Sequence, residues 1–263
     1  MATHAPAGQP CNCGLRGWMP GIEHLPIRWQ RPAHIVRDAG LMQPYVVVDH
    51  IAQGYIRTID GWATNGASKI ITHFAAERGG RKVQYQDIYT EGIHTSSVSS
   101  PTARLVQQYG SVAGRGVNPY SIGIEHEGFS VDPGYGYDYI YSAQRPWPDA
   151  MVNASIEIKR WIFAQADTNL GVPSRDTIIG HYEADAKNRI NDPSPANNRA
   201  VWPVERMIAE LTPKPSPPPV TYPSSPALDA IESRLAAAEV LATDLAALVQ
   251  QMREDLVQFR AGK

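Results

Sequence analysis

Two of the eight histidines follow short apolar runs of the kind that form buried strands. His50 comes after Tyr45 to Asp49 (YVVVD), and His181 comes after Thr177 to Gly180 (TIIG). Asp192, within the segment NDPSP, follows His181 by eleven positions. Two imidazoles and one carboxylate form a three-ligand zinc set whose fourth position is open to water. The pattern therefore predicts a site at which a metal ion lowers the pKa of water to about 7 and makes it a nucleophile.

Hydrolysis at such a site also needs a carboxylate that is not bound to the metal and can take the proton from the water. Glu125 ends the predicted strand Ser121 to Glu125 (SIGIE) and is the favoured residue. Glu127 competes with it, because residues two positions apart lie on the same face of a strand. A histidine at the end of a strand is also often structural, so spacing alone leaves that interpretation open.

The composition bounds the kind of protein. The chain has 263 residues, of which 43% are hydrophobic and 19% are charged, as in a globular protein with one well-buried domain and a smaller part. A formal charge of -2 offers no basic stripe, so we expect no nucleic-acid partner. We find no run near the roughly 20 apolar residues of a transmembrane segment. MATHAPAGQPCNCG has no signal-peptide pattern, so the chain is expected to stay in a cytoplasm until it is released.

The chain divides into four parts by composition. Residues 1–38 are rich in Pro, Gly and Trp and are predicted to form an irregular arm. Residues 39–212 alternate strand-like and helix-like segments, as an α/β domain does. Residues 213–226 form a proline-rich linker, which is stiff and extended rather than folded. Residues 227–260 are predicted to form a coiled-coil helix.

The central part contains the elements that must position the candidate ligands. The helical spacing of Met151, Ser155, Ile158 and Ile162 predicts one helix. Residues 203–211 (PVERMIAEL) are predicted to form another, with a proline in its first turn. The predicted strands are 45–49, 69–74, 82–85 and 121–125, and the predicted helices are 148–169 and 203–211.

The coiled-coil prediction depends on apolar residues in a strict alternation of three and four positions. These residues are Leu228, Ile231, Leu235, Ala238, Ala242, Leu245, Val249, Met252, Leu256 and Phe259. Such a seam favours a homo-oligomer formed through residues 227–260, of an order that the sequence does not predict. The alternative is a single amphipathic helix that packs on the domain.

Six blocks of the sequence resemble, in order, the motifs of the type 2 N-acetylmuramoyl-L-alanine amidases. That family is related to the peptidoglycan recognition proteins and the phage lysozyme-amidases. The resemblance spans about residues 45–211. The blocks are VVVDHIA, SKIITHF, KVQYQDIYTEGIHTSS, SIGIEHEG, IIGHYEADAKNRINDPSP and VWPVERMIAEL.

The resemblance implies an α/β fold with a mixed central β-sheet flanked by helices. It also implies one zinc ion per chain, with His50 and His181 as the first two ligands and Asp192 as the third. Glu125 matches the catalytic glutamate. His94 matches a histidine that relatives carry after an aromatic-rich segment.

One position departs from the family pattern. Many relatives have a lysine two positions before the third ligand, where it can stabilise the developing oxyanion, but this sequence has Ile190 there. Arg189 or Lys187 is the candidate replacement, because each can offer a charged donor. The alternative for Arg189 is a solvated loop residue.

The implied reaction is hydrolysis of the amide bond between N-acetylmuramic acid and L-alanine in bacterial peptidoglycan. We expect a phage endolysin that waits in the host cytoplasm and then acts at the cell wall. Two alternatives stay open: a cytoplasmic amidase that recycles muropeptides, and a non-catalytic peptidoglycan-binding module. The complete ligand set argues against the module, which has no need of an open metal site.

Overall fold

The computed structural model describes residues 9–11, 14–27, 42–68, 71–95, 98–110, 116–129, 146–189, 192–193, 202–213, 233–238, 240–245 and 248–252. The chain forms two compact units, Met1–Pro213 and Lys214–Lys263. Residues 214–226 of the predicted linker lie outside the described residues, as do the seam positions Leu228, Ile231, Leu256 and Phe259.

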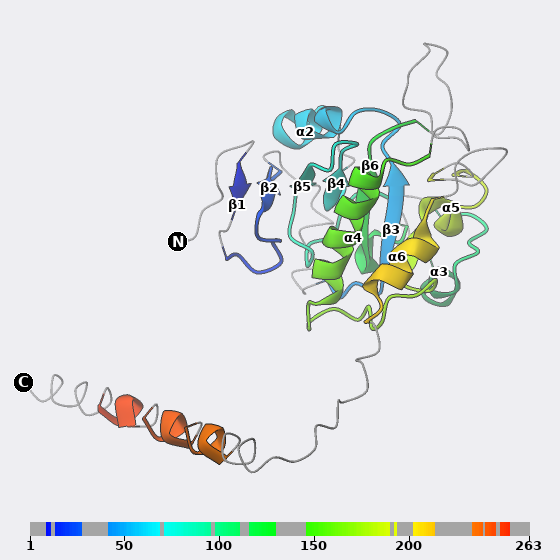
Figure 1. The fold of residues 1–263 in the computed structure, drawn as a ribbon. Helices are drawn as coiled ribbons and strands as arrows, with labels where there is room; N and C mark the ends of the chain where they lie inside the picture. The colour runs from blue at the N-terminus through cyan, green and yellow to red at the C-terminus, as the bar shows by residue number, and fades with distance from the viewer. Residues whose placement is uncertain are drawn as a thin grey trace, which may run out of the picture. The chain divides into compact units, whose positions relative to one another are not determined.

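The first unit is built on a mixed seven-stranded sheet in the order β1-β2-β5-β4-β6-β3-β7 (Figure 1). The β1–β2 and β4–β5 pairs are antiparallel, and all other neighbouring pairs are parallel. The prediction of a mixed sheet is therefore confirmed. The strands are β1 (Pro10–Cys11), β2 (Ile22–His24), β3 (Val46–Ile51), β4 (Phe74–Ala76), β5 (Lys82–Gln84), β6 (Ser121–His126) and β7 (Ile178–Gly180).

Strand β3 lies between β6 and β7 and is buried on both faces over its whole length. Its three consecutive valines, Val46 to Val48, suit this position because a strand covered on both sides reads as a continuous apolar run. Both neighbours run parallel to β3, so the carboxyl ends of all three strands meet at one edge of the sheet.

Two helices cover one face of the sheet, α4 (Asp149–Phe163) and α6 (Val204–Leu211) (Figure 1). The predicted helical face of α4 is buried at all four positions: Met151, Ser155, Ile158 and Ile162. The helix ends at Phe163 instead of continuing to Asn169, because residues 164–169 (AQADTN) bring no further large apolar side chain to that face.

The opposite face is covered by shorter elements. Helix α2 (Ile56–Asn65) packs over β4 and β5, and α3 (Arg104–Tyr109) packs beside β3 and β7. A 3-10 turn, η1 (Asn118–Tyr120), leads directly into β6, and α5 (His181–Ala184) follows β7 without an intervening loop.

The N-terminal segment departs from expectation. Residues 1–38 were predicted to be irregular, but β1 and β2 extend the sheet beyond β5. Glycines with positive φ make the bends between them, including Gly17 and Gly21, and the Gln84 amide bonds both Met19 and Gly17. Strands of two and three residues are too short for a period of two to be recognised in the sequence. The predicted strand 69–74 is also shifted, since β4 begins at Phe74; Lys69 and Ile70 lie outside the described residues.

A buried polar network ties β3 to the helices behind it. Lys159 Nζ of α4 donates to Asp49 Oδ1 at 2.7 Å, and Trp202 Nε1 donates to Asp49 Oδ2 at 2.7 Å. Ser155 Oγ lies 2.6 Å from Lys159 Nζ and 2.8 Å from His126 Nε2. Buried charges need such partners, because an unpaired one costs several kcal/mol. The network therefore fixes the strand that carries His50.

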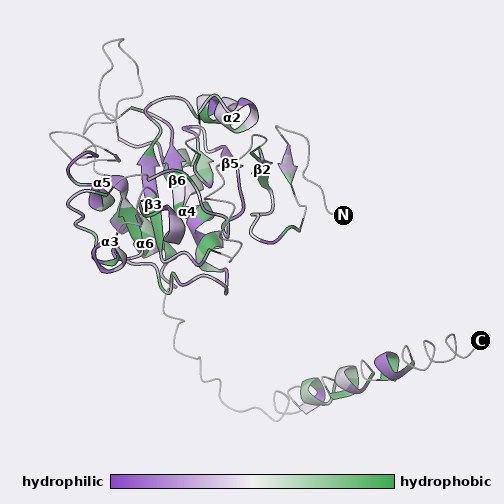
Figure 2. Ribbon diagram, turned by 180° about the vertical axis from the view of Figure 1, so that it is seen from behind, coloured by the Kyte–Doolittle hydropathy of each residue, from purple (hydrophilic) through white to green (hydrophobic). Residues whose placement is uncertain are grey.

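The second unit contains a helix over Ser233–Met252. Leu235, Leu245, Val249 and Met252 of the predicted seam are exposed on it, and so are Val240, Leu241 and Leu248, which lie outside the seam. Figure 2 shows apolar and polar residues mixed along this helix. Its length of 20 residues and mean hydropathy of 1.2 also meet the requirements of a membrane-spanning helix. By its length and composition this helix could cross a membrane, so the expectation that the chain has no such segment is not confirmed.

Candidate metal centre

The sheet topology brings the candidate residues to one edge. His50 is the fifth residue of β3 and pairs in register with Glu125 of β6. His181 directly follows β7, the neighbour of β3 on the other side. Polar groups at the carboxyl ends of adjacent parallel strands form the usual ligand site of open α/β sheets. The strand-end position predicted for both histidines is what places them together.

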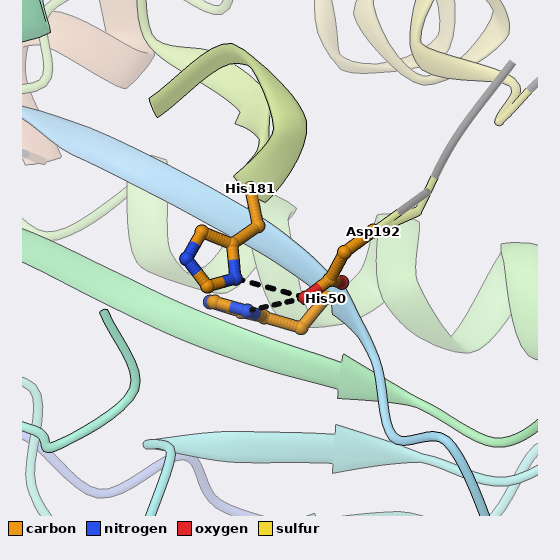
Figure 3. A group of neighbouring side chains, drawn as sticks. All are labelled: His50, His181 and Asp192. Atoms are coloured by element: carbon orange, nitrogen blue, oxygen red, sulfur yellow. Dashed lines mark hydrogen bonds and ion pairs between the residues drawn. The ribbon is translucent and has the colours of Figure 1, made fainter. Parts of the chain in front are cut away.

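The side chains of His50, His181 and Asp192 converge on a single point (Figure 3). One potential ligand atom from each lies within 4.8 Å of the other two, and all three residues are buried. His181 Nδ1 is 2.8 Å from Asp192 Oδ2, and His50 Nδ1 is 3.8 Å from the same oxygen. The predicted ligand set is therefore brought together by the fold.

The main chain on both sides holds Asp192 in place. The backbone N–H of Ile51, next to His50, donates to Asp192 Oδ1 at 2.7 Å. Tyr182 N donates to the carbonyl of Asp192, and Asp192 N donates to the carbonyl of Arg189. Asp192 Oδ1 thus accepts a hydrogen bond from the main chain, while Asp192 Oδ2 faces the two imidazoles.

The donor set fits zinc. Two imidazole nitrogens and one carboxylate oxygen are ordinary zinc ligands, and three protein ligands are typical of catalytic sites with an open fourth position. His181 Nε2 and Glu125 Oε2 are buried and have no hydrogen-bond partner among the described residues. Unpartnered buried polar atoms are rare in native proteins, and at this edge they mark a place for a polar ligand or substrate.

Electrostatics favour the ligand forms of these residues. Burial, and then the neighbouring His181, lower the pKa of His50, so its ring is held neutral. Burial alone would raise the pKa of Asp192, but the hydrogen bond with His181 and the proximity of His50 hold it well below its usual value. A neutral imidazole and an ionised carboxylate are the forms that bind metal.

The structure separates the two candidate glutamates. Glu127 is occupied, because its carboxylate accepts the backbone N–H of Ile56 at 3.4 Å and that of Arg78 at 3.1 Å. The Glu127 carboxylate thus stabilises the first turn of α2 and the main chain at Arg78. Burial, and then the charge of Asp192, raise the pKa of Glu125 well above its usual value. Glu125 is thus the carboxylate that stands beside the ligand set.

The two basic candidates differ in their relation to the site. Arg189 is exposed, but its charge lowers the pKa of Glu125, so it lies within electrostatic reach of that carboxylate. Its carbonyl also accepts a hydrogen bond from Asp192 N. Lys187 is exposed as well, and its backbone N–H donates to Ser99. Ile190 lies outside the described residues.

His94 lies behind His50. Its Nδ1 is 2.9 Å from His50 Nε2, and its Nε2 is 3.2 Å from Ser121 Oγ. Burial, followed by the charges of His50 and His73, lowers the pKa of His94 well below its ordinary value. The sequence singled out His94 by resemblance alone. It gave no sign of Ser121 or Asn118, whose residue types and spacing are those of any polar turn before a strand.

The described residues also form a surface hollow of about 650 Å³ away from this edge. Arg57, Asp60, Glu23 and Arg81 line it, but none of the candidate ligands does. The guanidinium group of Arg81, which lines the hollow, already forms ion pairs with Glu23, Asp60 and Glu77. The hollow is therefore separate from the group of candidate ligands.

Comparisons with known proteins point to one family. The family model of N-acetylmuramoyl-L-alanine amidases matches residues 41–195. A search of curated proteins found no match. Among solved structures, AmpD is 17% identical with a TM-score of 0.48, and the match covers 75% of this chain and 98% of that one. The amidase LysC from Clostridium intestinale is 16% identical, with a TM-score of 0.43 and coverage of 73% and 98%. The amidase AmiD from E. coli is 18% identical, with a TM-score of 0.45 and coverage of 70% and 61%.

Proposed function

Because this chain belongs to the N-acetylmuramoyl-L-alanine amidase family, we propose that it is a zinc-dependent endolysin acting on bacterial peptidoglycan. The bond to be cleaved joins the lactyl group of N-acetylmuramic acid to the amino group of L-alanine. The observation that carries the proposal is the convergence of His50, His181 and Asp192 beside Glu125, all within the matched residues.

His50, His181 and Asp192 would hold one zinc ion, which when bound supplies a Lewis acid for a water molecule and for the amide carbonyl. Glu125 takes the proton of the attacking water and passes it to the departing amine. Its raised pKa suits both steps, because a group that titrates closer to neutrality accepts and returns a proton readily. Arg189 offers a positive charge near the same carboxylate and steadies the negative charge that develops on the carbonyl oxygen.

The second unit supports a role on intact wall rather than on soluble fragments. An enzyme that recycles small muropeptides needs no additional helix, whereas a lytic enzyme gains from a module that holds several catalytic units together. In this proposal the protein accumulates in the host cytoplasm and reaches the wall after the membrane has been breached.

Mass spectrometry of digested peptidoglycan tests the reaction. Purified sacculi and soluble muropeptides are incubated with the protein, with and without a chelator. We expect new free amino termini on L-alanine, their loss on chelation, and their return when zinc is added. Stoichiometric zinc without any product would instead support a binding module. Release from muropeptides but not from sacculi would favour the recycling enzyme.

A further inference from the structure

The ring of His94 is enclosed in a slot that two glycines make possible. A Cβ atom added at Gly123 would lie 2.6 Å from His94 Cγ, and one added at Gly92 would lie 2.9 Å from His94 Cδ2. Real side chains do not come so close, so no other residue at either position leaves room for the imidazole. Asn118 Oδ1 holds the main chain of this segment by accepting the N–H groups of His94 and Thr95 at 3.1 and 2.7 Å.

The hydrogen bonds around this ring have a single consistent direction. The carbonyl of Val117 can only accept, so Ser121 Oγ donates to it at 2.8 Å. Ser121 Oγ is then the acceptor for His94 Nε2–H at 3.2 Å, which leaves His94 Nδ1 without a hydrogen.

His94 Nδ1 can therefore only accept. It lies 3.0 Å from the hydroxyl of Thr95 and 2.9 Å from His50 Nε2. Two bare ring nitrogens would repel each other at 2.9 Å, so His50 Nε2 must carry the hydrogen of that contact. With its hydrogen on Nε2, His50 presents a bare Nδ1, and this is the nitrogen that faces Asp192 Oδ2.

We propose that His94 is a positioning residue that fixes the ring and the tautomer of His50, so that Nδ1 is ready to bind the metal before the metal arrives. The inference rests on the proposed zinc amidase function, and it concerns a residue that does not itself touch the metal. His181 is held differently, because its Nδ1 bonds Asp192, itself a candidate ligand, and its Nε2 lacks a partner among the described residues. The two histidine ligands are thus prepared to different degrees.

Zinc affinity and the tautomer of the metal-free protein test this role, since neither depends on turnover. The zinc dissociation constant is measured by competition with a chromophoric chelator. Long-range ¹H–¹⁵N spectra of the metal-free chain report which nitrogen of His50 carries the hydrogen. We expect Nε2–H in the wild type. His94→Ala should lose this preference and bind zinc about 10- to 100-fold more weakly, as is typical when a partner of a metal ligand is removed.

Two serines provide a matched pair of variants. Ser121→Ala removes the end of the hydrogen-bond chain and should weaken zinc binding in the same direction, by less than His94→Ala. Ser155→Ala removes an equally buried hydroxyl from the network behind β3 rather than from the chain that leads to His50 Nε2, so it should weaken zinc binding by less than Ser121→Ala does. If His94→Ala fails to fold, the comparison of the two serine variants decides the question.

Wild-type zinc affinity in His94→Ala or in Ser121→Ala would overturn the inference, and so would His50 protonated at Nδ1 in the metal-free wild type. Product release by the wild type alongside such results would leave the proposed function intact. Conversely, weakened zinc binding in the variants without any product from the wild type would defeat the proposed function alone. A wild type that binds no zinc would defeat both.

Discussion

At the scale of single residues, neighbouring carboxylates of the same type have different tasks. Glu125 and Glu127 leave the same strand two positions apart, yet Glu127 is used by backbone N–H groups while one oxygen of Glu125 has no partner among the described residues. Sequence spacing could not distinguish them. The partners of Glu127 come from segments about 50 and 70 positions away, and only the fold brings them to it.

Glu125→Gln should keep zinc and lose catalysis. The amide fills the same space but cannot accept a proton, so the rate should fall by about 10²- to 10⁴-fold. Product release from sacculi and metal content by mass spectrometry check the two halves of this statement. Glu127→Gln is the control and should stay near the wild-type rate. Full activity of Glu125→Gln would remove that residue from the mechanism.

Arg189→Ala should alter the pH dependence as well as the rate. The charge of Arg189 lowers the pKa of Glu125, so its removal raises that pKa, and the acid limb of the kcat/KM profile moves to higher pH. The side chain is exposed, so we expect a shift below about one pH unit. The maximal rate should fall by up to about 10²-fold if the guanidinium meets the oxyanion. A Lys187→Ala variant should show neither change, and an unmoved acid limb in Arg189→Ala would contradict the assignment.

At the scale of elements, the sequence predicted strands where apolar runs are long and missed them where they are short. Residues 45–49 and 121–125 were located to within about two residues of β3 and β6. The strand-end rule then gave His50 and Glu125. Strands β1 and β2 could not be predicted, because their two and three residues pair with distant β5 and have no local period. Ser121 and Asn118 were missed because their role is relayed through His94.

The interface of β6 and α4 should make the protein sensitive to acid. Burial, against the opposing effect of Asp49, lowers the pKa of His126 from 6.5 to about 4. A histidine with a lower pKa in the folded state binds protons more readily when unfolded. Its contribution to stability is therefore complete above about pH 6.5 and is lost as the pH falls from there to about 4.

The loss from His126 should be on the order of 3 kcal/mol in the free energy of unfolding. Urea denaturation of the metal-free protein at pH 7, 5.5 and 4.5 measures it. His126→Asn should be less stable at neutral pH and should show a flatter pH dependence across this window. An unchanged slope in the variant would show that His126 does not titrate as described.

At the scale of the whole molecule, the second unit is expected to govern assembly and not chemistry. Leu235, Leu245, Val249 and Met252 are exposed, and a heptad seam buries such side chains in another copy of the chain. A chain that ends at Pro213 should sediment as a monomer and still cleave soluble muropeptides. The full chain should form a defined oligomer, which light scattering after size exclusion can measure.

Leu245→Asp is the corresponding point variant, because a charge in the seam opposes helix association. It should dissociate the oligomer and leave cleavage of muropeptides unchanged. The helix also has the length and hydropathy of a membrane span. Flotation of a monomeric full chain with lipid vesicles would therefore contradict the prediction of self-association and favour insertion into lipid.

The pairing of β2 with β5 has a practical consequence for chimeric enzymes. The family match begins at residue 41, but β2 (Ile22–His24) supplies the parallel partner of β5 and lies ahead of it. A catalytic module that begins at residue 41 would lack β2, and the N–H and C=O groups of β5 that pair with β2 would be exposed. Exposed edge strands can pair between molecules and cause aggregation. A catalytic module moved into a chimera should therefore include β1 and β2.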